Sequence, residues 1–244
     1  MELGNNKTDY AVALSKIASS IIFPELGFLG EIIGNVIPNQ RIDRIAKYVK
    51  QLDERLSSIP LEKLNKLVEN EQFIDLIEES CYMSARIMSD ERREYIINII
   101  ANGIEEEELD MIQSKQLLKI LNELNDIEVI LLRYHLHPTI EGDEEFREKH
   151  KNLLNGVNKY SHKDEKEFVN YIMKESYTEH LDRLGLINHI FRLDKNGQPI
   201  IDRITGKPET RYIRITTLGK LLLKKIGFSD EIEIYRKPIQ VNRL

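Results

Sequence analysis

The sequence contains few of the residues on which disulfide-bonded or membrane-spanning proteins depend. Among its 244 residues Cys81 is the only cysteine, so an internal disulfide is excluded and nothing indicates an oxidising compartment. The most apolar window, residues 15–38, is divided by Pro24 into pieces that are too short to span a bilayer. The first ten residues also lack the basic and apolar regions of a signal peptide. We therefore expect a cytoplasmic protein.

Motifs for catalysis and metal binding are missing as well. The sequence has no Gly-x-Ser-x-Gly, no glycine-rich phosphate loop and no His-Glu-x-x-His. His135 and His137 are two residues apart, so on a helix they would point to nearly opposite sides. The helical spacing of Cys81 from Ile77 and Met88 predicts a small buried residue and not a nucleophile. We expect no enzymatic activity, no cofactor and no metal.

Charge is abundant but unevenly distributed. Charged residues make up 31% of the chain and hydrophobic residues 41%, which is typical of a soluble globular protein. The formal net charge of -6 combines an acidic excess in residues 1–128 with a basic excess in residues 129–244. This asymmetry indicates different partners for the two ends, or electrostatic docking of one end on the other.

The first half of the chain has the periodicity of successive amphipathic helices, and we expect an α-helical domain over residues 1–124. Apolar residues at spacings of three and four form one clear stripe, comprising Ile42, Ile45, Val49, Leu52 and Leu56. Asn70 and Ser89 stand where helix N-caps are expected, and Gly103 stands at an expected helix end. Glu78-Glu79 and Glu105 to Glu108 each indicate a solvated face or a helix start.

Three glycines, Gly27, Gly30 and Gly34, lie in the apolar window before this stripe. Their spacing allows helices to approach closely, which suits a packing or interface position. The window can form a buried helical hairpin, an oligomer interface or a membrane-inserting segment, and the sequence leaves these alternatives open.

The second half changes character, and we expect a separate domain over residues 125–228 followed by a C-terminal tail, 229–244. Asn125 with Glu128 forms a capping-box pattern, and Ser176 with Glu179 forms another that predicts a fresh helix. Gly185 should end this helix. Asn196-Gly197 then predicts a hairpin turn between two strands, and Thr216 or Thr217 should begin a last helix.

Two resemblances follow from these segments. The order of helix, "HLDRLGLI", long hairpin and "RYIRITTLGKLLLKKIG" resembles the winged-helix fold of bacterial regulators over about residues 125–228. The helical segments "IIGNVIPNQRIDRIAKYVKQLDERL" and "SDERREYIINIIANGI" resemble bacterial abortive-infection alpha proteins. Together they imply a mostly α protein, with an N-terminal multi-helix region followed by a winged helix-turn-helix domain with a β-hairpin wing. The second resemblance also implies a role in phage defence.

The charges divide the expected winged helix into two unlike surfaces. The two expected helices over residues 164–183 are acidic, which disfavours contact with phosphates, although Thr178, His180 and Arg183 remain candidates for base contacts. The expected wing is basic and is the candidate surface for a nucleic-acid backbone or a partner; alternatively its charges are only solvated. Its basic residues are Arg192, Lys195, Arg203, Lys207, Arg211 and Arg214.

The sequence therefore favours a non-enzymatic regulatory or adaptor protein that binds a protein partner or itself, with nucleic acid as a further ligand of the wing. The first alternative is a winged-helix transcription regulator. The second is a membrane-acting defence effector that uses residues 9–37. We expect a protein partner or a homo-oligomer, and we do not expect a membrane partner.

Overall fold

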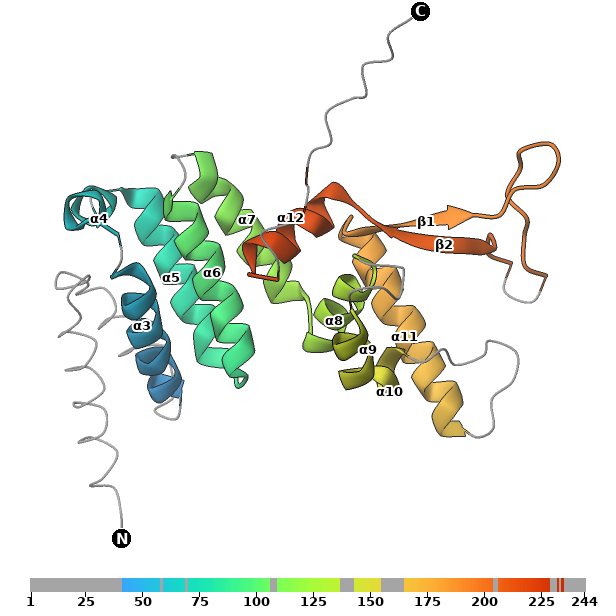
Figure 1. The fold of residues 1–244 in the computed structure, drawn as a ribbon, viewed down its shortest axis with the longest axis horizontal. Coiled ribbons are helices and arrows are strands. Elements are labelled where there is room, and N and C mark those ends of the chain that lie inside the picture. The colour runs from blue at the N-terminus through green and yellow to red at the C-terminus, as the bar shows by residue number, and fades with distance from the viewer. Residues whose placement is uncertain are drawn as a thin grey trace, which may run out of the picture. The chain divides into compact units, whose positions relative to one another are not determined.

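A computed structural model describes most of the chain after its first forty residues (Figure 1). The described residues are 41–57, 59–68, 70–105, 109–136, 143–154, 165–203, 206–228, 232 and 234. They are mostly helical, with one small antiparallel sheet near the C-terminus, as the sequence predicts. They divide into two compact units that meet in the sequence between Asn122 and Glu123, and the segment Lys225–Gly227 belongs to the first.

Unit 1 consists of helices that pack through their apolar faces. They are α3 (Ile42–Leu56), α4 (Leu61–Val68), α5 (Glu71–Arg86), α6 (Asp90–Glu105) and α7 (Leu109–Glu123). Helices α3, α5 and α6 contact one another, and α4 contacts α5. The expected stripe of α3 is confirmed, because Ile45, Val49, Leu52 and Leu56 are all buried.

One polar pair lies inside this core. The Tyr48 hydroxyl of α3 donates a 2.7 Å hydrogen bond to Ser80 Oγ of α5, and Ser80 Oγ donates to the Ile77 carbonyl at 2.6 Å. Each hydroxyl thus has a partner, which offsets the loss of its hydration. Cys81 lies beside Ser80 and is buried, as expected, and burial raises the pKa of its thiol to about 12. A thiol that stays protonated is a poor nucleophile.

Three helix ends in unit 1 test local sequence signals, and two of them agree with the prediction. The Asn70 side chain accepts hydrogen bonds from the backbone of Gln72 and Phe73, and Ser89 Oγ accepts one from Arg92 N, so both expected N-caps are confirmed. The expected end at Gly103 is wrong, because α6 continues to Glu105 and Gly103 is buried within it. Buried neighbours such as Ile100 hold the helix through a residue whose intrinsic helix propensity is low.

Unit 2 combines helices with the hairpin. Its helices are α8 (Asp126–Tyr134), α9 (Glu144–Lys149), α10 (Lys151–Leu154), α11 (Glu165–Arg183) and α12 (Thr217–Lys225). The capping box of α8 is confirmed: Glu128 N donates to Asn125 Oδ1 at 3.0 Å, and Asn125 N donates to Glu128 Oε2 at 2.7 Å.

The long helix α11 corrects the expected start at Ser176. The chain is one continuous helix from Glu165 to Arg183, with no turn before Ser176. No glycine or proline interrupts this stretch, so the Ser-x-x-Glu pattern alone does not break the helix. The helix ends at Gly185, as expected, where a φ of 71° lets Leu186 N donate to the Leu181 carbonyl at 3.0 Å.

Strands β1 (Ile187–Phe191) and β2 (Thr210–Ile215) pair antiparallel and form the stem of a hairpin (residues 187–215). The register places Ile187 opposite Ile215 and Ile190 opposite Tyr212, with an irregularity between Ile190 and Phe191. Further along, isolated bridges join Leu193 to Pro199 and Ile201 to Pro208. The hairpin projects outward from the end of α11 at which β1 begins (Figure 1).

The base of the hairpin is fixed to α12. Thr216 Oγ1 accepts a hydrogen bond from Gly219 N at 3.0 Å, so Thr216 is the N-cap that the sequence predicts. Thr216 N also donates to the Leu186 carbonyl at 3.0 Å. A Cβ on Gly219 would lie 2.3 Å from the Leu186 oxygen and 2.8 Å from Ile215 Cγ1, so only glycine allows this close approach.

Candidate functional site

Large apolar side chains gather on the exposed hairpin. Leu193 is 58% exposed, Ile201 52% and Tyr212 49%, and Phe191 and Ile200 are also exposed. Contiguous exposed apolar surface is uncommon on a monomeric protein and indicates an interaction site. We call Leu193, Ile200 and Ile201 the hairpin tip.

The predicted wing cations all lie on this hairpin and are exposed. Arg192 pairs with Glu209 at 3.3 Å, and Lys207 pairs with Glu179 of α11, which raises the pKa of Lys207 through a hydrogen bond and the opposite charge. The four others form no ion pair among the described residues, and we call them the hairpin cations: Lys195, Arg203, Arg211 and Arg214. The hairpin thus presents positive charge together with apolar surface.

The three candidate base-reading residues of α11 are not brought together on one exposed face. Thr178 is buried, and its hydroxyl donates to the Lys174 carbonyl at 2.8 Å. His180 Nδ1 lies 2.6 Å from Glu128 Oε1 of α8, with its side chain only 19% exposed. Arg183 is exposed. The geometry therefore gives no support to base contacts by Thr178 or His180.

The Glu128–His180 contact is a structural pair that sequence reasoning missed. Glu128 is 2% exposed, and its second carboxylate oxygen already accepts the Asn125 N–H. One buried carboxylate therefore closes the capping box of α8 and also fixes the C-terminal part of α11. The capping pattern was visible in the sequence, but no local signal could indicate a partner 52 residues away.

A second polar contact holds Asp143, the N-cap residue of α9. The Arg133 guanidinium lies 3.2 Å from Asp143 Oδ1 and stacks over Phe146, with 4.0 Å between its Cζ and the ring centroid. It also lies 5.0 Å from the Phe228 ring centroid. These contacts hold the arginine by charge, by cation–π attraction and by packing. They link α8 to α9 within unit 2, while the other carboxylate oxygen, Asp143 Oδ2, is buried without a hydrogen-bond partner among the described residues.

His135, at the C-terminal end of α8, has an unusual electrostatic environment. Burial, then the nearby Lys174, then His189, lower the pKa of His135 to about 4. A helix C-terminus favours a cation, so the desolvation and the neighbouring positive charges outweigh the helix dipole here. Burial also lowers the pKa of Lys174, whose Nζ donates to the Leu154 carbonyl at 3.2 Å. His135 is therefore neutral at pH 7.

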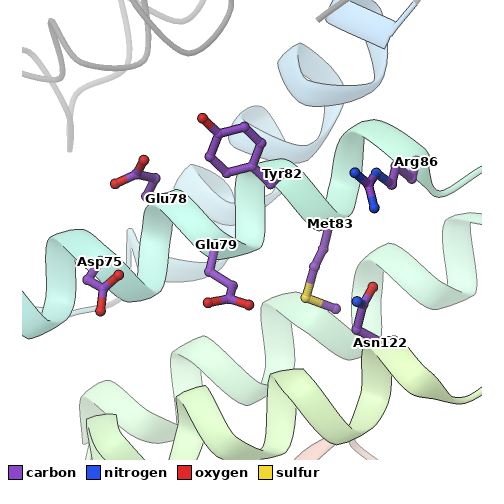
Figure 2. Close-up of a pocket in the computed structure, with 7 residues that line it drawn as sticks. All are labelled: Asp75, Glu78, Glu79, Tyr82, Met83, Arg86 and Asn122. Atoms are coloured by element: carbon purple, nitrogen blue, oxygen red, sulfur yellow. The ribbon is translucent and has the colours of Figure 1, made fainter. Parts of the chain in front are cut away.

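Unit 1 has a separate open pocket of about 400 Å³ along α5 (Figure 2). Its lining residues are Asp75, Glu78, Glu79, Tyr82, Met83, Arg86 and Asn122. Lys115 forms ion pairs with Asp75 and, at 3.9 Å, with Glu79, so the acidic wall is partly neutralised. The sequence assigned Glu78 and Glu79 to a solvated face or a helix start, and they lie within α5. It could not show that α7 supplies Asn122 to the same pocket.

Some sequence predictions concern residues that the structure does not describe. Gly27, Gly30 and Gly34 lie outside the described residues, as do the whole apolar window and the segment 9–37 of the membrane-effector alternative. Within the described part of the chain, no three His, Cys, Asp or Glu side chains come close enough to hold a metal ion. No helix built from described residues is both long and apolar enough to cross a membrane.

The comparisons with known proteins bear on the helices and the hairpin together. No curated protein and no solved structure matches the chain. The family described as abortive infection alpha matches residues 40–226. This range includes every helix and strand named above, from the start of α3 to the end of α12. This confirms the second of the two resemblances. The chain belongs to the abortive infection alpha family.

Proposed function

We propose that this protein is a non-enzymatic, cytoplasmic adaptor of phage defence that binds a protein partner, or a second copy of itself, through its hairpin. Membership of the abortive infection alpha family suggests the defence role. The observation that carries the binding mode is the exposed hairpin tip, with Leu193 at 58% and Ile201 at 52% exposure, flanked by basic residues.

The tip is built to present these side chains and not to bury them. Its backbone is paired with itself: Ile200 N donates to the Arg192 carbonyl at 2.9 Å, and Asp194 N donates to the Gln198 carbonyl at 2.8 Å. The Asp194 carboxylate also accepts hydrogen bonds from Asn196 N and Gln198 N at 2.8 and 2.9 Å. A backbone ordered in advance loses less entropy on binding, which favours a partner with an apolar surface and an acidic rim.

Nucleic acid is the second candidate ligand, and the hairpin cations favour it. Four exposed basic side chains without an ion pair among the described residues match the electrostatic signature of phosphate binding. We also infer that unit 2 is a winged-helix variant, since α11, the hairpin and α12 follow one another in that order. A sequence-reading transcription regulator has less support, because Thr178 and His180 are held by internal hydrogen bonds.

Site-specific crosslinking in cells tests the protein-binding proposal. A photoreactive amino acid at Leu193 should give discrete protein adducts, or a crosslinked dimer, during phage infection. The matched control is the same amino acid at Ile112, which is 60% exposed but lies on α7 of unit 1. Adducts at neither position, or the same adducts at both, would contradict binding through the hairpin tip.

A further inference from the structure

We propose that the outward face of the hairpin stem binds single-stranded nucleic acid, with the Tyr212 ring as a stacking surface for a base and Arg214 beside it for a phosphate. This inference rests on the nucleic-acid candidate above and names its ligand class and its contact residues. It concerns the stem, and the tip remains the surface proposed for a protein.

The strand register defines this face. Side chains alternate between the two faces of a strand, so Tyr212 and Arg214 share one face of β2. Across from them on β1, Ile190 lies opposite Tyr212 and Asn188 opposite Arg214. Tyr212 is 49% exposed, and Asn188 and Arg214 are exposed too. Directly opposed residues lie about 5 Å apart, so the four side chains form one continuous surface.

The other face of the same stem is turned inward at its base. Ile187 is fully buried and Ile215 is 7% exposed, and they lie opposite each other in the register. On that face, further along, the His189 and Phe191 rings stack with centroids 6.2 Å apart, and His189 Nδ1 lies 3.0 Å from Thr210 Oγ1. Those rings already contact each other, whereas the Tyr212 side chain is half exposed and has no ring contact among the described residues.

The charges on this face suit an anionic ligand. Arg214 forms no ion pair among the described residues, whereas Arg192, which follows β1, is paired with Glu209. Proteins bind single strands by combining positive charge with exposed aromatic rings, because each unpaired base offers a ring face for stacking. Arg214 and Tyr212 place one of each on this face. In a duplex the bases are already stacked on one another, so this ring would have no base to receive.

The neighbouring helix disfavours a duplex independently. A helix that enters the major groove needs outward side chains that are neutral and polar or basic. The C-terminal half of α11 instead exposes the acidic residues Glu175, Glu179 and Asp182. Lys207 forms an ion pair with Glu179 and also attracts Glu175, but these acidic side chains still outnumber it. A duplex docked on α11 would therefore meet repulsion, whereas a single strand can follow the stem alone.

Fluorescence anisotropy with the full-length protein tests the inference. The probes are a labelled oligothymidine of about 16 nucleotides and the duplex of the same length, each over a salt series, with polyglutamate as a third anionic ligand. Tyr212→Leu should weaken oligothymidine binding roughly tenfold or more, and Tyr212→Phe, which keeps the ring, should bind like the parent. Arg214→Gln should lower the salt slope by about 0.7.

Two controls separate stacking from damage to the hairpin. Phe191→Leu removes an aromatic ring from the opposite face and should leave oligothymidine binding unchanged. Circular dichroism and the melting temperature should be the same for Tyr212→Leu and Tyr212→Phe, since the side chain is half exposed.

Each remaining outcome decides against the inference. Oligothymidine binding that is unaffected by Tyr212→Leu, or duplex binding that is tighter than single-strand binding, would overturn it while leaving nucleic acid as a ligand. Polyglutamate binding as tight as oligothymidine binding, and independent of Tyr212, would assign the stem to an acidic protein. Binding to neither nucleic acid would overturn both the inference and the nucleic-acid candidate, but not the crosslinking result at the tip.

Discussion

The two units of this protein differ in how many of their large apolar side chains are exposed. Among the described residues, the large apolar side chains exposed in unit 1 are Met88 and Ile112, whereas unit 2 exposes a longer set. That set consists of Phe168, Val169, Ile172, Met173, Phe191, Leu193, Ile200, Ile201 and Tyr212. Unit 1 therefore has the character of a closed helical core, and unit 2 that of a surface available for binding. Substitutions in the two units should separate stability from function.

The largest effect should come from the one fully buried leucine of α11. Leu181→Asp places a carboxylate at a position with 0% exposure, and burying an unpaired charge costs several kcal/mol, so unit 2 should unfold. Leu184→Asp is the matched control, because Leu184 is half-buried and its carboxylate can reach water. Thermal unfolding followed by circular dichroism compares them. A parent-like melting temperature for Leu181→Asp would show that this part of α11 does not pack as described.

In unit 1 the contrast between core and surface can be measured on a single helix. Leu118 of α7 is fully buried, so Leu118→Ala should destabilise the protein by about 2–5 kcal/mol. Ile112 of the same helix is 60% exposed, and Ile112→Ala should change stability by no more than about 0.5 kcal/mol. Urea unfolding gives both values, and equal effects would contradict a closed core in unit 1.

Unit 2 should lose stability in mild acid because of His135. Its pKa is about 4 in the folded protein and 6.5 in the unfolded chain, so the unfolded state takes up a proton first as the pH falls. This contribution is complete above about pH 6.5 and is lost between pH 6.5 and 4, about 3 kcal/mol in all.

The control for this pH dependence is a variant that cannot take up the proton. His135→Leu should retain more of its stability than the parent between pH 7 and about pH 5, by about 2 kcal/mol in urea unfolding. Parallel pH profiles for the parent and the variant would show that His135 is not held neutral by burial, Lys174 and His189.

A smaller loss is expected where α12 meets the base of the hairpin. Gly219→Ala inserts a methyl group at 2.3 Å from the Leu186 carbonyl oxygen, so the helix must shift, at about 1–3 kcal/mol. Gly197→Ala, in the exposed turn, meets no atom within 4 Å and is strained only by its φ of 79°. If Gly219→Ala melts at the parent temperature, the close approach of α12 to Leu186 is not part of the folded state.

The sequence predicts those features whose causes lie within a few residues. The stripe of α3, the capping box at Asn125 and Glu128, the end of α11 at Gly185 and the turn at Asn196-Gly197 all depend on local spacing or backbone geometry. The helix start expected at Ser176 is wrong because the Ser-x-x-Glu pattern is local. It does not show that the preceding residues already form the same helix.

The sequence predicts the basic residues of the candidate site but not its exposed apolar side chains. The basic residues of the hairpin could be read directly, since charged side chains are rarely buried. The exposure of Leu193, Ile200 and Ile201 could not, because an apolar residue in a strand is ordinarily assigned to a core face. The ion pair between Lys207 and Glu179 and the contact between His180 and Glu128 join segments far apart in the chain, so only the fold reveals them.

The central claim is that the hairpin tip carries function and not stability, and phage plating tests it most directly. Leu193→Asp with Ile201→Asp should keep the parent melting temperature, because both side chains are more than half exposed, with 58% and 52% accessible. In cells challenged with a phage that the parent protein restricts, this variant should restore plaque formation, and Met88→Asp with Ile112→Asp on unit 1 should not. Full protection by the hairpin variant, or equal loss with both variants, would contradict the account.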